Sequence, residues 1–524
     1  MKKILFFSLL LLAASCRNDR SLPQGLSPKE ALKTFQLPEG YQIELVAAEP
    51  LVADPVAMEI DEKGNFYVVE MHGYPEDLKG SGVIKLLRDT DRDGWPDQSI
   101  VFADSLVLPT GIIRWKKGVL VVDVPHVWYL EDSTGDGYAD IKRKMLTGFS
   151  LTNPQHIANT PLLGPDNWIY LAHQGAILPK VSMLFNDTGT LVRYANRPDG
   201  PVLPRDADGR NIRFKPDKDQ LEMLSGESQY GHTFDAWGHH LCTSNANHLF
   251  HEVIAAPYLK RNPSLLLADA TQNIPDHGDA AEVYPITKNP EHQLLTDVGV
   301  ITSSCGVTWY QGDCFPDSFL NVTFIAEPVH NLVHADKIVD RGATFTASRL
   351  LQQKEFLSST DSWFRPVQFY MGPDGALYVI DYYRQIVEHP EWMSEEVNRS
   401  GALYNGSDKG RIYRVTPKGT PAPAWSTQLQ QQKTSPDYWV SLLAHRSIWW
   451  RRTAQRLISD QGKETYEKLL HQFIDTTTSA AGVVHALWLL HDFSSLTENE
   501  LDNALRHPVA GVRENGIRLA EFYL

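Results

Sequence analysis

Two short stretches carry acidic residues at the spacing of a calcium-binding loop. The first has the pattern D-x-D-x-D-G-x-x-D, made by Asp89, Asp91, Asp93 and Asp97 with Gly94 at the sharp turn. Carboxylates at alternating positions suit the oxygen shell that Ca²⁺ requires. The twelfth position is not glutamate, so the loop is not an EF-hand. The spacing predicts a structural calcium site.

A second acidic loop follows 43 residues later. It holds Asp132, Asp136 and Asp140, and Thr134 replaces one carboxylate of the first loop. The alternative for both loops is an acidic turn held by hydrogen bonds from Asp side chains to the backbone. Calcium and the plain turn both remain open from the sequence.

Histidine is the second residue type in this sequence, after aspartate, that suits chemistry. Most members of a large histidine set are satisfied polar residues or surface rings, while a neutral imidazole with a pKa near the operating pH suits a general base. His156 stands apart because it lies eight residues before the turn at 164–167, at the end of a predicted strand. The histidines in or near predicted strands are His72, His126, His156, His173, His232, His248, His277, His330 and His334.

A turn followed by an apolar strand recurs six times and predicts the elements that position these residues. Turn-forming Gly, Pro, Asp and Asn ahead of β-branched and aromatic residues are typical of a tight hairpin entering a strand. Radial repetition of small sheets is typical of a β-propeller, so we expect a mainly β protein with six blades. The turns lie at 61–65, 116–118, 164–167, 235–238, 315–317 and 372–375.

The propeller is expected to span residues 37–416. Strand 410–415 is expected to close the ring by pairing with a strand near the N-terminus. Residues 176–230 and 253–300 are the longest intervals between turns, and we expect them to form loops over one face. Ligand sites tend to lie on such loops.

A change of pattern follows the propeller. Residues 417–435 are rich in Pro, Thr and Gln, which predicts a linker. Beyond them the hydrophobic period becomes helical, and a pattern of L-x-H, Arg and R-L recurs at an offset of 62 residues. This pattern resembles HEAT repeats and predicts a short α-helical domain over 436–524.

The N-terminus resembles a bacterial lipoprotein signal. Lys2 and Lys3 precede an apolar run, 4–15, that is too short to span a bilayer. The resemblance implies that 1–16 is a signal, that cleavage precedes Cys16, and that its acylated sulfur anchors an exported protein to a membrane, on the periplasmic or cell-surface side. The alternative is a secreted protein with an ordinary signal peptide. Residues 17–36 are expected to form a tether.

Composition limits which partners the protein is expected to bind and how its cysteines can pair. The chain has 524 residues, 42% of them hydrophobic, and a formal net charge of −15. It is therefore expected to fold as two or more domains and to bind no nucleic acid. With Cys16 acylated, Cys305 and Cys314 are close enough in sequence to pair, which leaves Cys242 as a buried thiol. No C-x-x-C-H motif occurs, so no covalent c-type haem is encoded.

Three blocks of sequence resemble the soluble glucose/sorbosone dehydrogenase superfamily. They are LPEGYQIELVA, HIANTPLLGPDNWIYLAHQG and RPVQFYMGPDGALYVID, which begin at Leu37, His156 and Arg365. The closer resemblance is to the large membrane-bound dehydrogenases of planctomycete-like and related bacteria. Those join such a propeller to helical repeats and often to a C-terminal cytochrome c domain, which this sequence does not show. The resemblance implies a six-bladed propeller that binds pyrroloquinoline quinone (PQQ) and calcium.

The resemblance also implies roles for individual residues. His156 matches the base that takes the proton of a sugar or alcohol hydroxyl, while PQQ supplies the redox chemistry. Arg365 matches an arginine that pairs with the PQQ carboxylates. Val367 stands where the family has a second arginine. We expect His173 and Gln229 beside His156 and Arg365 at one mouth of the propeller.

Other positions depart from the family's catalytic pattern. Ser228 falls where the family has its active-site arginine, His173 falls on an aspartate, and Pro109 falls on a glutamine. Two functions therefore stay open. The first is a PQQ-dependent dehydrogenase that oxidises a sugar or other alcohol and passes electrons to an acceptor such as a cytochrome. The second is a non-catalytic propeller that binds a glycan or protein partner.

Overall fold

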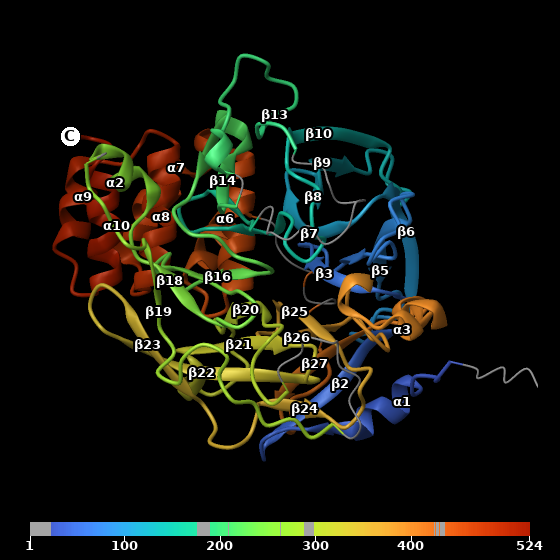
Figure 1. Cartoon of the computed structure of the whole chain (residues 1–524). Helices are drawn as coiled ribbons and strands as arrows, with labels where there is room; N and C mark the ends of the chain where they lie inside the picture. Colours follow the sequence, from blue (N-terminus) through green and yellow to red (C-terminus); the bar gives the residue numbers. More distant parts are fainter. Residues whose placement is uncertain are drawn as a thin grey trace, which may run out of the picture.

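Six antiparallel sheets form a β-propeller (Figure 1). The computed structural model describes residues 22–174, 189–207, 209–262, 264–287, 298–423, 425, 429 and 435–524. The innermost strands contact their neighbours around the ring, and the contact of β25 (Pro366–Met371) with β3 (Pro55–Ile60) joins its last and first blades. The predicted fold, six blades followed by helices, is confirmed.

Each blade is counted from its innermost strand outward. Blade 1 holds β3, β4 (Phe66–Glu70), β5 (Gly82–Arg88) and β6 (Gln98–Leu106). Blade 2 holds β7 (Pro109–Trp115), β8 (Gly118–Asp123), β9 (His126–Glu131), β10 (Ile141–Thr147) and β13 (Arg193–Tyr194). Blade 3 holds β11 (Asn159–Leu163), β12 (Ile169–Ala172), β14 (Ile212–Lys215) and β15 (Gln220–Met223).

The remaining blades are built in the same way. Blade 4 holds β16 (His232–Phe234), β17 (His240–Cys242), β18 (Phe250–Glu252) and β19 (Thr271–Asn273). Blade 5 holds β20 (Cys305–Trp309), β21 (Val322–Glu327), β22 (Leu332–Asp340), β24 (Leu357–Ser359) and β1 (Phe35–Gln36), and β23 (Phe345–Arg349) pairs with β22. Blade 6 holds β25, β26 (Leu377–Asp381), β27 (Arg411–Pro417) and β2 (Tyr41–Ala48).

The six predicted turns each precede the second strand of one blade: β4, β8, β12, β17, β21 or β26. An aspartate organises several of them by accepting backbone hydrogen bonds. Asp61 Oδ1 accepts from the amides of Lys63 and Asn65, each at 2.9 Å. The strands that follow are buried along their whole length in β4, β8 and β26. Turn chemistry and apolar runs therefore fix the repeat.

The N- and C-terminal parts of the propeller meet in blade 6. β27 pairs with β2 from Tyr41↔Pro417 to Ala48↔Arg411, so the predicted closure is confirmed. The tether prediction is wrong for its last residues. Ser27 caps a short helix, α1 (Pro28–Ala31), and β1 then pairs with β24 of blade 5.

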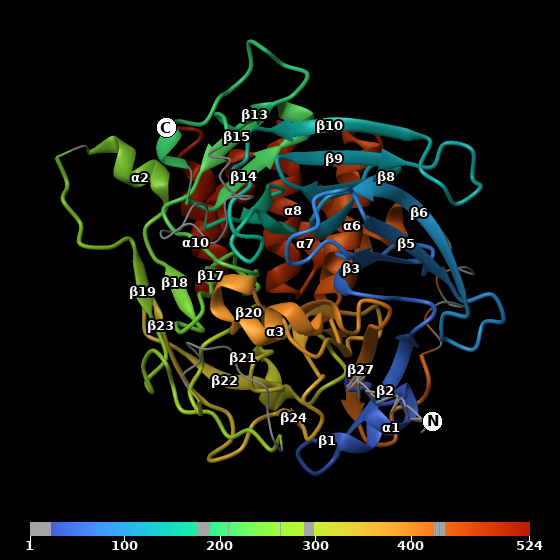
Figure 2. The ribbon, with the colours of Figure 1, turned by 45° about the vertical axis from the view of Figure 1, so that its right-hand side comes forward.

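The C-terminal helices cover one face of the propeller; they lie at the upper left in Figure 1 and behind the ring of blades in Figure 2. Several of the repeat turns lie beneath them. Gln455 donates to the carbonyl of Gly164 at 3.1 Å, and Trp450 Nε1 donates to the carbonyl of Pro373 at 2.8 Å. The helices are α5 (Pro436–Ser441), α6 (Ile448–Gln461), α7 (Lys463–Thr476), α8 (Ala480–Asp492), α9 (Glu498–Leu505) and α10 (Ala510–Ala520). The helical segment is therefore packed onto the propeller.

The segment predicted as a linker contributes to this packing where the structure describes it. Trp425 and Leu429 are buried in the main hydrophobic core, and the Trp425 ring lies 5.5 Å from the Phe66 ring. Two further short helices, α2 (Ala256–Arg261) and α3 (Glu395–Ser400), lie in propeller loops.

The three cysteines in the described part of the chain are free thiols. Pairing of Cys305 with Cys314 was therefore a wrong prediction. Cys305 begins β20 and Cys314 lies beyond its end. A strand advances by about 3.3 Å per residue, which places the two thiols toward opposite ends of the blade. Cys242 is buried in β17, as expected.

Candidate functional site

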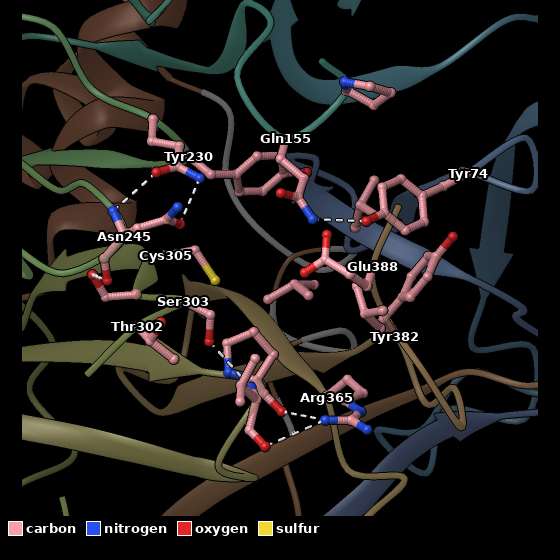
Figure 3. Close-up of a pocket in the computed structure, with 18 of the residues that line it drawn as sticks. Tyr74, Gln155, Tyr230, Asn245, Thr302, Ser303, Cys305, Arg365, Tyr382 and Glu388 are labelled. Carbon is pink, nitrogen blue, oxygen red and sulfur yellow. Dashed lines mark hydrogen bonds between the residues drawn. The ribbon is translucent and has the colours of Figure 1, made fainter. Parts of the chain in front are cut away.

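A cavity of about 120 Å³ lies at the end of the propeller channel away from the helices (Figure 3). We call it the mouth cavity. Its walls come from inner strands and from loops between blades, so residues far apart in sequence meet there. Its lining includes the aromatic residues Tyr74, Tyr230 and Tyr382, the amides Gln155, Gln229 and Asn245, and the hydroxyl residues Thr302, Ser303 and Ser304.

Hydrogen bonds orient the amides of the mouth cavity. Gln155 Nε2 donates to the Tyr74 hydroxyl at 2.7 Å. Gln229 Nε2 donates to Asn245 Oδ1 at 2.7 Å, and Gln229 Oε1 accepts from the Asn245 backbone amide at 2.9 Å. Tyr382 donates its hydroxyl to the Met71 carbonyl at 2.8 Å, which fixes the ring in the wall. The polar groups of the cavity are therefore held in place by hydrogen bonds and carry no net charge, while apolar side chains such as Val56, Val329 and Val387 form much of the remaining lining.

Glu388 is the acidic group of the mouth cavity. It follows β26 by seven residues and is 6% exposed. Burial raises the pKa of Glu388 to about 7, although the His389 amide, which donates at 2.8 Å, acts in the opposite direction. A carboxyl whose pKa lies near neutrality and which faces a cavity can exchange a proton with a ligand. Glu388 was not among the predicted site residues, because a single glutamate in a loop carries no local signal of its burial.

Arg365 lines the mouth cavity, and its guanidinium donates to main-chain carbonyls; its predicted contact with the carboxylates of a cofactor stays a prediction. Nη1 donates to Pro328 at 2.8 Å, Nη2 to Gln385 at 2.6 Å, and Nε to Arg384 at 3.3 Å. The side chain is only 3% exposed. Arg365 therefore joins the loops that follow β21 and β26.

These residues do not fit PQQ. A cofactor with several carboxylates needs cationic partners. Among the described residues that line the mouth cavity, Arg365 is the one Lys or Arg, and its donors are directed to carbonyls. The lining also contains the carboxyl group of Glu388, which would repel a carboxylate of the cofactor once it is ionised.

His156 lies behind the wall of the mouth cavity. Its neighbour Gln155 lines the cavity, whereas His156 is buried with Nδ1 2.5 Å from Gln174 Oε1. Burial lowers the pKa of His156, and the contact with Gln174 acts in the opposite direction. A neutral, buried imidazole held by an amide is well placed to support the loop. The predicted role as base stays a prediction.

The other two predicted cofactor residues are separated from each other. Gln229 lines the mouth cavity, while His173 lines a different cavity together with Phe149. The two rings there lie 5.7 Å apart, edge to face, and His173 Nδ1 is 3.2 Å from the Arg210 carbonyl. The structure therefore brings Arg365 and Gln229 to one cavity and places His156 and His173 elsewhere.

The first acidic loop brings three of its four carboxylates together. Asp89, Asp91 and Asp93 each offer an oxygen, and these atoms lie within 4.8 Å of one another. Asp97 accepts from the backbone amide of Thr90 at 2.9 Å and from its hydroxyl at 2.6 Å. Asp89 also accepts from the amides of Arg92 at 2.7 Å and Gly94 at 2.9 Å, so this loop has the bonds of an acidic turn as well. Calcium at this loop stays a prediction, now with three converging carboxylates.

The second acidic loop has the bonds of a plain turn. Asp132 accepts from the amides of Gly135 at 2.6 Å and Gly137 at 2.7 Å. Asp140 accepts from Ser133, and Asp136 accepts from the Tyr138 amide at 2.9 Å, so each carboxylate has a protein partner. Calcium here also stays a prediction, and the acidic-turn alternative describes every bond seen.

Comparison with solved structures finds similar chains of low sequence identity. The PQQ domain of pyranose dehydrogenase from Coprinopsis cinerea has a TM-score of 0.41 and 13% identity, over 73% of this chain and 97% of that chain. A luciferin-regenerating enzyme has a TM-score of 0.40 and 11% identity, over 73% and 98%. PQQ-bound aldose sugar dehydrogenase from Streptomyces coelicolor has a TM-score of 0.34 and 10% identity, over 72% and 100%. Similarity at this level does not identify an activity.

No curated protein matches the sequence. A family model does match, over residues 27–419, which is most of the chain and the whole propeller. The chain belongs to the family described as "Domain of unknown function (DUF7133)".

Proposed function

We propose that the mouth cavity binds a neutral, hydroxyl-rich small molecule of the sugar or polyol class. The observation that carries this proposal is the lining, in which three tyrosine rings and several apolar side chains, among them Val56 and Met71, lie beside amides, hydroxyls and one carboxyl. Aromatic faces pack against the apolar face of such a molecule, and a few well-placed polar groups fix its orientation. An anionic ligand is disfavoured because Glu388 lies in the wall.

Asn245 and Glu388 are the groups that we expect to contact the ligand. Asn245 is exposed, and because its Oδ1 accepts from Gln229, its amide nitrogen remains to donate to a hydroxyl. Glu388 accepts from a hydroxyl when it is ionised. Together they offer a donor and an acceptor to neighbouring hydroxyl groups.

Calorimetric titration with glucose, galactose and sorbitol tests this proposal. We expect saturable binding to the wild type and an affinity at least tenfold weaker for Asn245→Ala, the loss expected from one or two hydrogen bonds. Asn196→Ala is the matched control, since Asn196 is exposed in the loop that follows β13 and outside the cavity. Equal weakening by both substitutions, or no binding of any of these sugars, would contradict the proposal.

A second candidate function is oxidation of the bound sugar or alcohol. The specific observation that favours it is the pKa of Glu388, about 7 within the cavity, which suits a general base for a hydroxyl proton. In this candidate Glu388, rather than His156, is the base. Reduction of an artificial electron-accepting dye in the presence of the sugar tests it, and Glu388→Gln is expected to abolish the reaction. Absence of dye reduction by the wild type would leave the non-catalytic binding function.

The electron acceptor of that reaction is a separate proposal. Oxidation of an alcohol gives up the hydroxyl proton, which Glu388 takes, and a hydride from the carbon that bears the hydroxyl, which must pass to a two-electron acceptor. PQQ does not fit the described lining, so we propose an uncharged quinone in the cavity as the hydride acceptor. A protein such as a cytochrome, which takes one electron at a time, then reoxidises the reduced quinone. Assays of the wild type with and without added cytochrome c, using one sugar that binds, would show whether electrons reach a protein partner.

We also propose that the protein is exported and anchored to a membrane through lipid on Cys16. Cys16 lies outside the described residues, so the sequence pattern at 1–16 is the support. Among the described helices, none has the length and apolar character needed to cross a bilayer. Cys16→Ala is expected to move the protein from the membrane fraction to the soluble exported fraction. Retention of that variant with the membranes would contradict acylation at this residue.

A further inference from the structure

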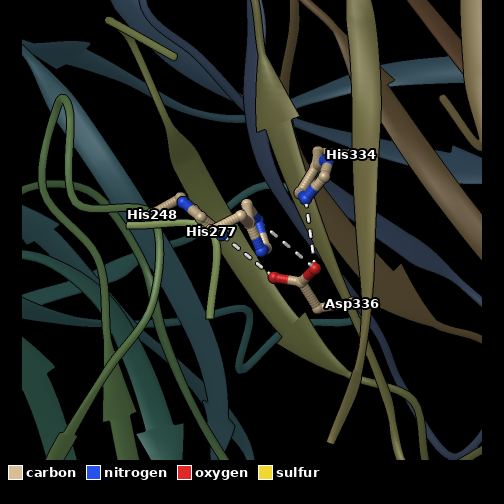
Figure 4. Close-up of side chains that lie close together, drawn as sticks. All are labelled: His248, His277, His334 and Asp336. Carbon is tan, nitrogen blue, oxygen red and sulfur yellow. Dashed lines mark hydrogen bonds and ion pairs between the residues drawn. The ribbon is translucent and has the colours of Figure 1, made fainter. Parts of the chain in front are cut away.

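Three histidines and one aspartate meet between blades 4 and 5, away from the mouth cavity (Figure 4). We call this the histidine cluster: His248, His277, His334 and Asp336. Each offers one ligand atom, and the four atoms lie within 4.8 Å of one another. The cluster is buried except for His277, whose side chain is 14% exposed.

All three imidazoles present Nε2 to the same carboxylate. His248 Nε2 lies 2.9 Å from Asp336 Oδ2, while His334 Nε2 and His277 Nε2 lie 3.2 Å and 3.7 Å from Oδ1. The ring centroids are 5.1, 5.2 and 5.5 Å apart, so the three rings are nearly equally spaced from one another. Figure 4 shows the rings from three separate segments turned toward Asp336.

Hydrogen bonds alone do not account for this arrangement. His277 Nε2 is buried and has no hydrogen-bond partner among the described residues. A buried polar atom without a partner costs about 1–3 kcal/mol, so such atoms are uncommon unless they serve a ligand. The atom lies at the centre of the cluster, where a cation would be its partner.

The opposite ring nitrogens of His334 and His277 have partners typical of metal-binding histidines, whereas His248 Nδ1 is buried without a hydrogen-bond partner among the described residues. His334 Nδ1 lies 2.7 Å from Glu355 Oε2, and His277 Nδ1 lies 3.0 Å from Asp276 Oδ1. A carboxylate that accepts a proton from Nδ1 fixes the tautomer in which Nε2 carries a lone pair. The carboxylates thus prepare Nε2 of both rings to coordinate a cation.

We propose that the histidine cluster binds one Zn²⁺ ion through the three Nε2 atoms and one oxygen of Asp336. Zinc binds imidazole nitrogen at roughly 2.0–2.1 Å and carboxylate oxygen at roughly 2.0–2.2 Å, so neighbouring ligands of a tetrahedral site lie about 3.3–3.5 Å apart. Asp336 Oδ1 lies 3.2 Å from His334 Nε2 and 3.7 Å from His277 Nε2, on either side of that value, while His248 Nε2 lies 2.9 Å from the other oxygen, Oδ2. Three imidazoles exclude Ca²⁺ and Mg²⁺, which prefer oxygen.

The ion has a structural role. Four protein ligands complete a tetrahedral site and leave no position for substrate. His248 lies between β17 and β18 and His277 follows β19, both of blade 4, while His334 and Asp336 lie on β22 of blade 5. Zinc therefore ties the two blades together. His248 is three residues from Asn245, so the ion also holds one wall of the mouth cavity.

Metal analysis of the full-length protein tests the proposal. After equilibrium dialysis against micromolar Zn²⁺ and removal of unbound metal, mass spectrometry is expected to find one zinc per chain. His277→Gln is expected to abolish this zinc, and His251→Gln is the control. His251 is a buried histidine on β18 of blade 4 that lies 3.2 Å from the Thr344 hydroxyl, outside the cluster.

A milder substitution keeps the test decisive if His277→Gln does not fold. The Asp276 side chain is 50% exposed, and Asp276→Asn removes the carboxylate behind His277. We expect zinc affinity to fall about 10–100-fold. The proposal would be overturned if the wild type held no zinc after dialysis, or if His277→Gln and Asp276→Asn both kept full zinc affinity. It would also be overturned if the protein retained another metal in preference to zinc when both were present.

Discussion

The two ends of the propeller channel are built from the same six inner strands but differ in the surroundings of their buried carboxyl groups. The mouth cavity is open to ligand and contains Glu388 among neutral groups. The other end is covered by α6, which encloses a second cavity of about 140 Å³ between Trp449 and Arg452 of the helix and the inner strands. We call this the covered cavity. Glu59 of β3 lies in its wall.

Both ends contain a carboxyl whose pKa is raised to about 7 by burial. Glu59 accepts from the Tyr370 hydroxyl at 2.9 Å, and the positive charges of Arg456, Arg114 and Arg452 oppose the rise in its pKa. Glu388 has no such arginine shell and faces the open cavity. A raised pKa therefore does not mark a functional site unless a ligand can reach the group.

The largest effect is expected at the covered end. Trp450 is buried, donates to the Pro373 carbonyl at 2.8 Å, and packs edge to face on Trp449 at 4.7 Å. Trp450→Ala should lower the free energy of unfolding by about 3–5 kcal/mol, measured by urea denaturation. Sugar affinity at the mouth should not change in the folded variant.

Phe522→Ala is the control for that prediction, because Phe522 is 63% exposed. Its effect should stay within about 0.5 kcal/mol. A Trp450→Ala variant with wild-type stability would show that the helices do not depend on this contact, and the distinction between the two ends would lose its structural basis.

The next effect concerns pH. Because the folded pKa of Glu388 is about 7 and the ordinary value is 4.5, the folded state keeps a proton that the unfolded state loses between these values. This group therefore destabilises the wild type progressively as pH rises from about 4.5 to 7. Glu388→Gln should gain stability relative to the wild type over that range, by up to about 3 kcal/mol, and show no further change above pH 7.

Glu59→Gln should behave in the same way, since its pKa is raised equally. Added ligand is expected to affect the stability of these two variants differently. A sugar that binds at the mouth should change the pH dependence of the wild type and of Glu59→Gln, but not that of Glu388→Gln. Urea denaturation at pH 5, 6, 7 and 8 checks this, and an equal ligand effect in both variants would contradict it.

The sequence predicted the scaffold well because the scaffold is periodic. Each predicted turn enters the second strand of a blade, and the closure of β27 on β2 follows the same alternation. The site was less predictable because it depends on side-chain directions at six separate strand ends. Gln229 and Arg365 reach the mouth cavity, but His156 turns behind its wall, and no local pattern distinguishes Gln155 from His156.

Glu388 and the histidine cluster were missed for a related reason. Their chemistry comes from burial and from partners distant in sequence, such as Asp336 with His248. The nine histidines in or near predicted strands could be found from the sequence, but three of them meet only after blades 4 and 5 pack together. The sequence gives the type of each residue, but only the folded structure shows which distant residues lie together.

A smaller effect is expected at the first acidic loop. If Ca²⁺ binds Asp89, Asp91 and Asp93, removing it with a calcium chelator should lower stability by about 1–2 kcal/mol, the effect of a ligand at roughly ten to thirty times its dissociation constant. Asp89→Asn should remove the response, and Asp132→Asn in the second loop is the matched control. A chelator response that persists in Asp89→Asn would place calcium elsewhere.

No effect is expected from PQQ. Because the donors of Arg365 are directed to main-chain carbonyls, added PQQ should not be retained on desalting and its absorbance should not shift. Retention of one PQQ per chain, lost in Val367→Asp, would show that the mouth accepts an anionic cofactor and would reverse the argument about its charge.

A crystal structure of the protein soaked with the tightest-binding sugar tests the central claim most directly. The account predicts one sugar in the mouth cavity, with a hydroxyl within hydrogen-bonding distance of Glu388 and another near the Asn245 amide nitrogen. Sugar found only on the outer surface or in the covered cavity, with the mouth cavity filled by solvent, would contradict it.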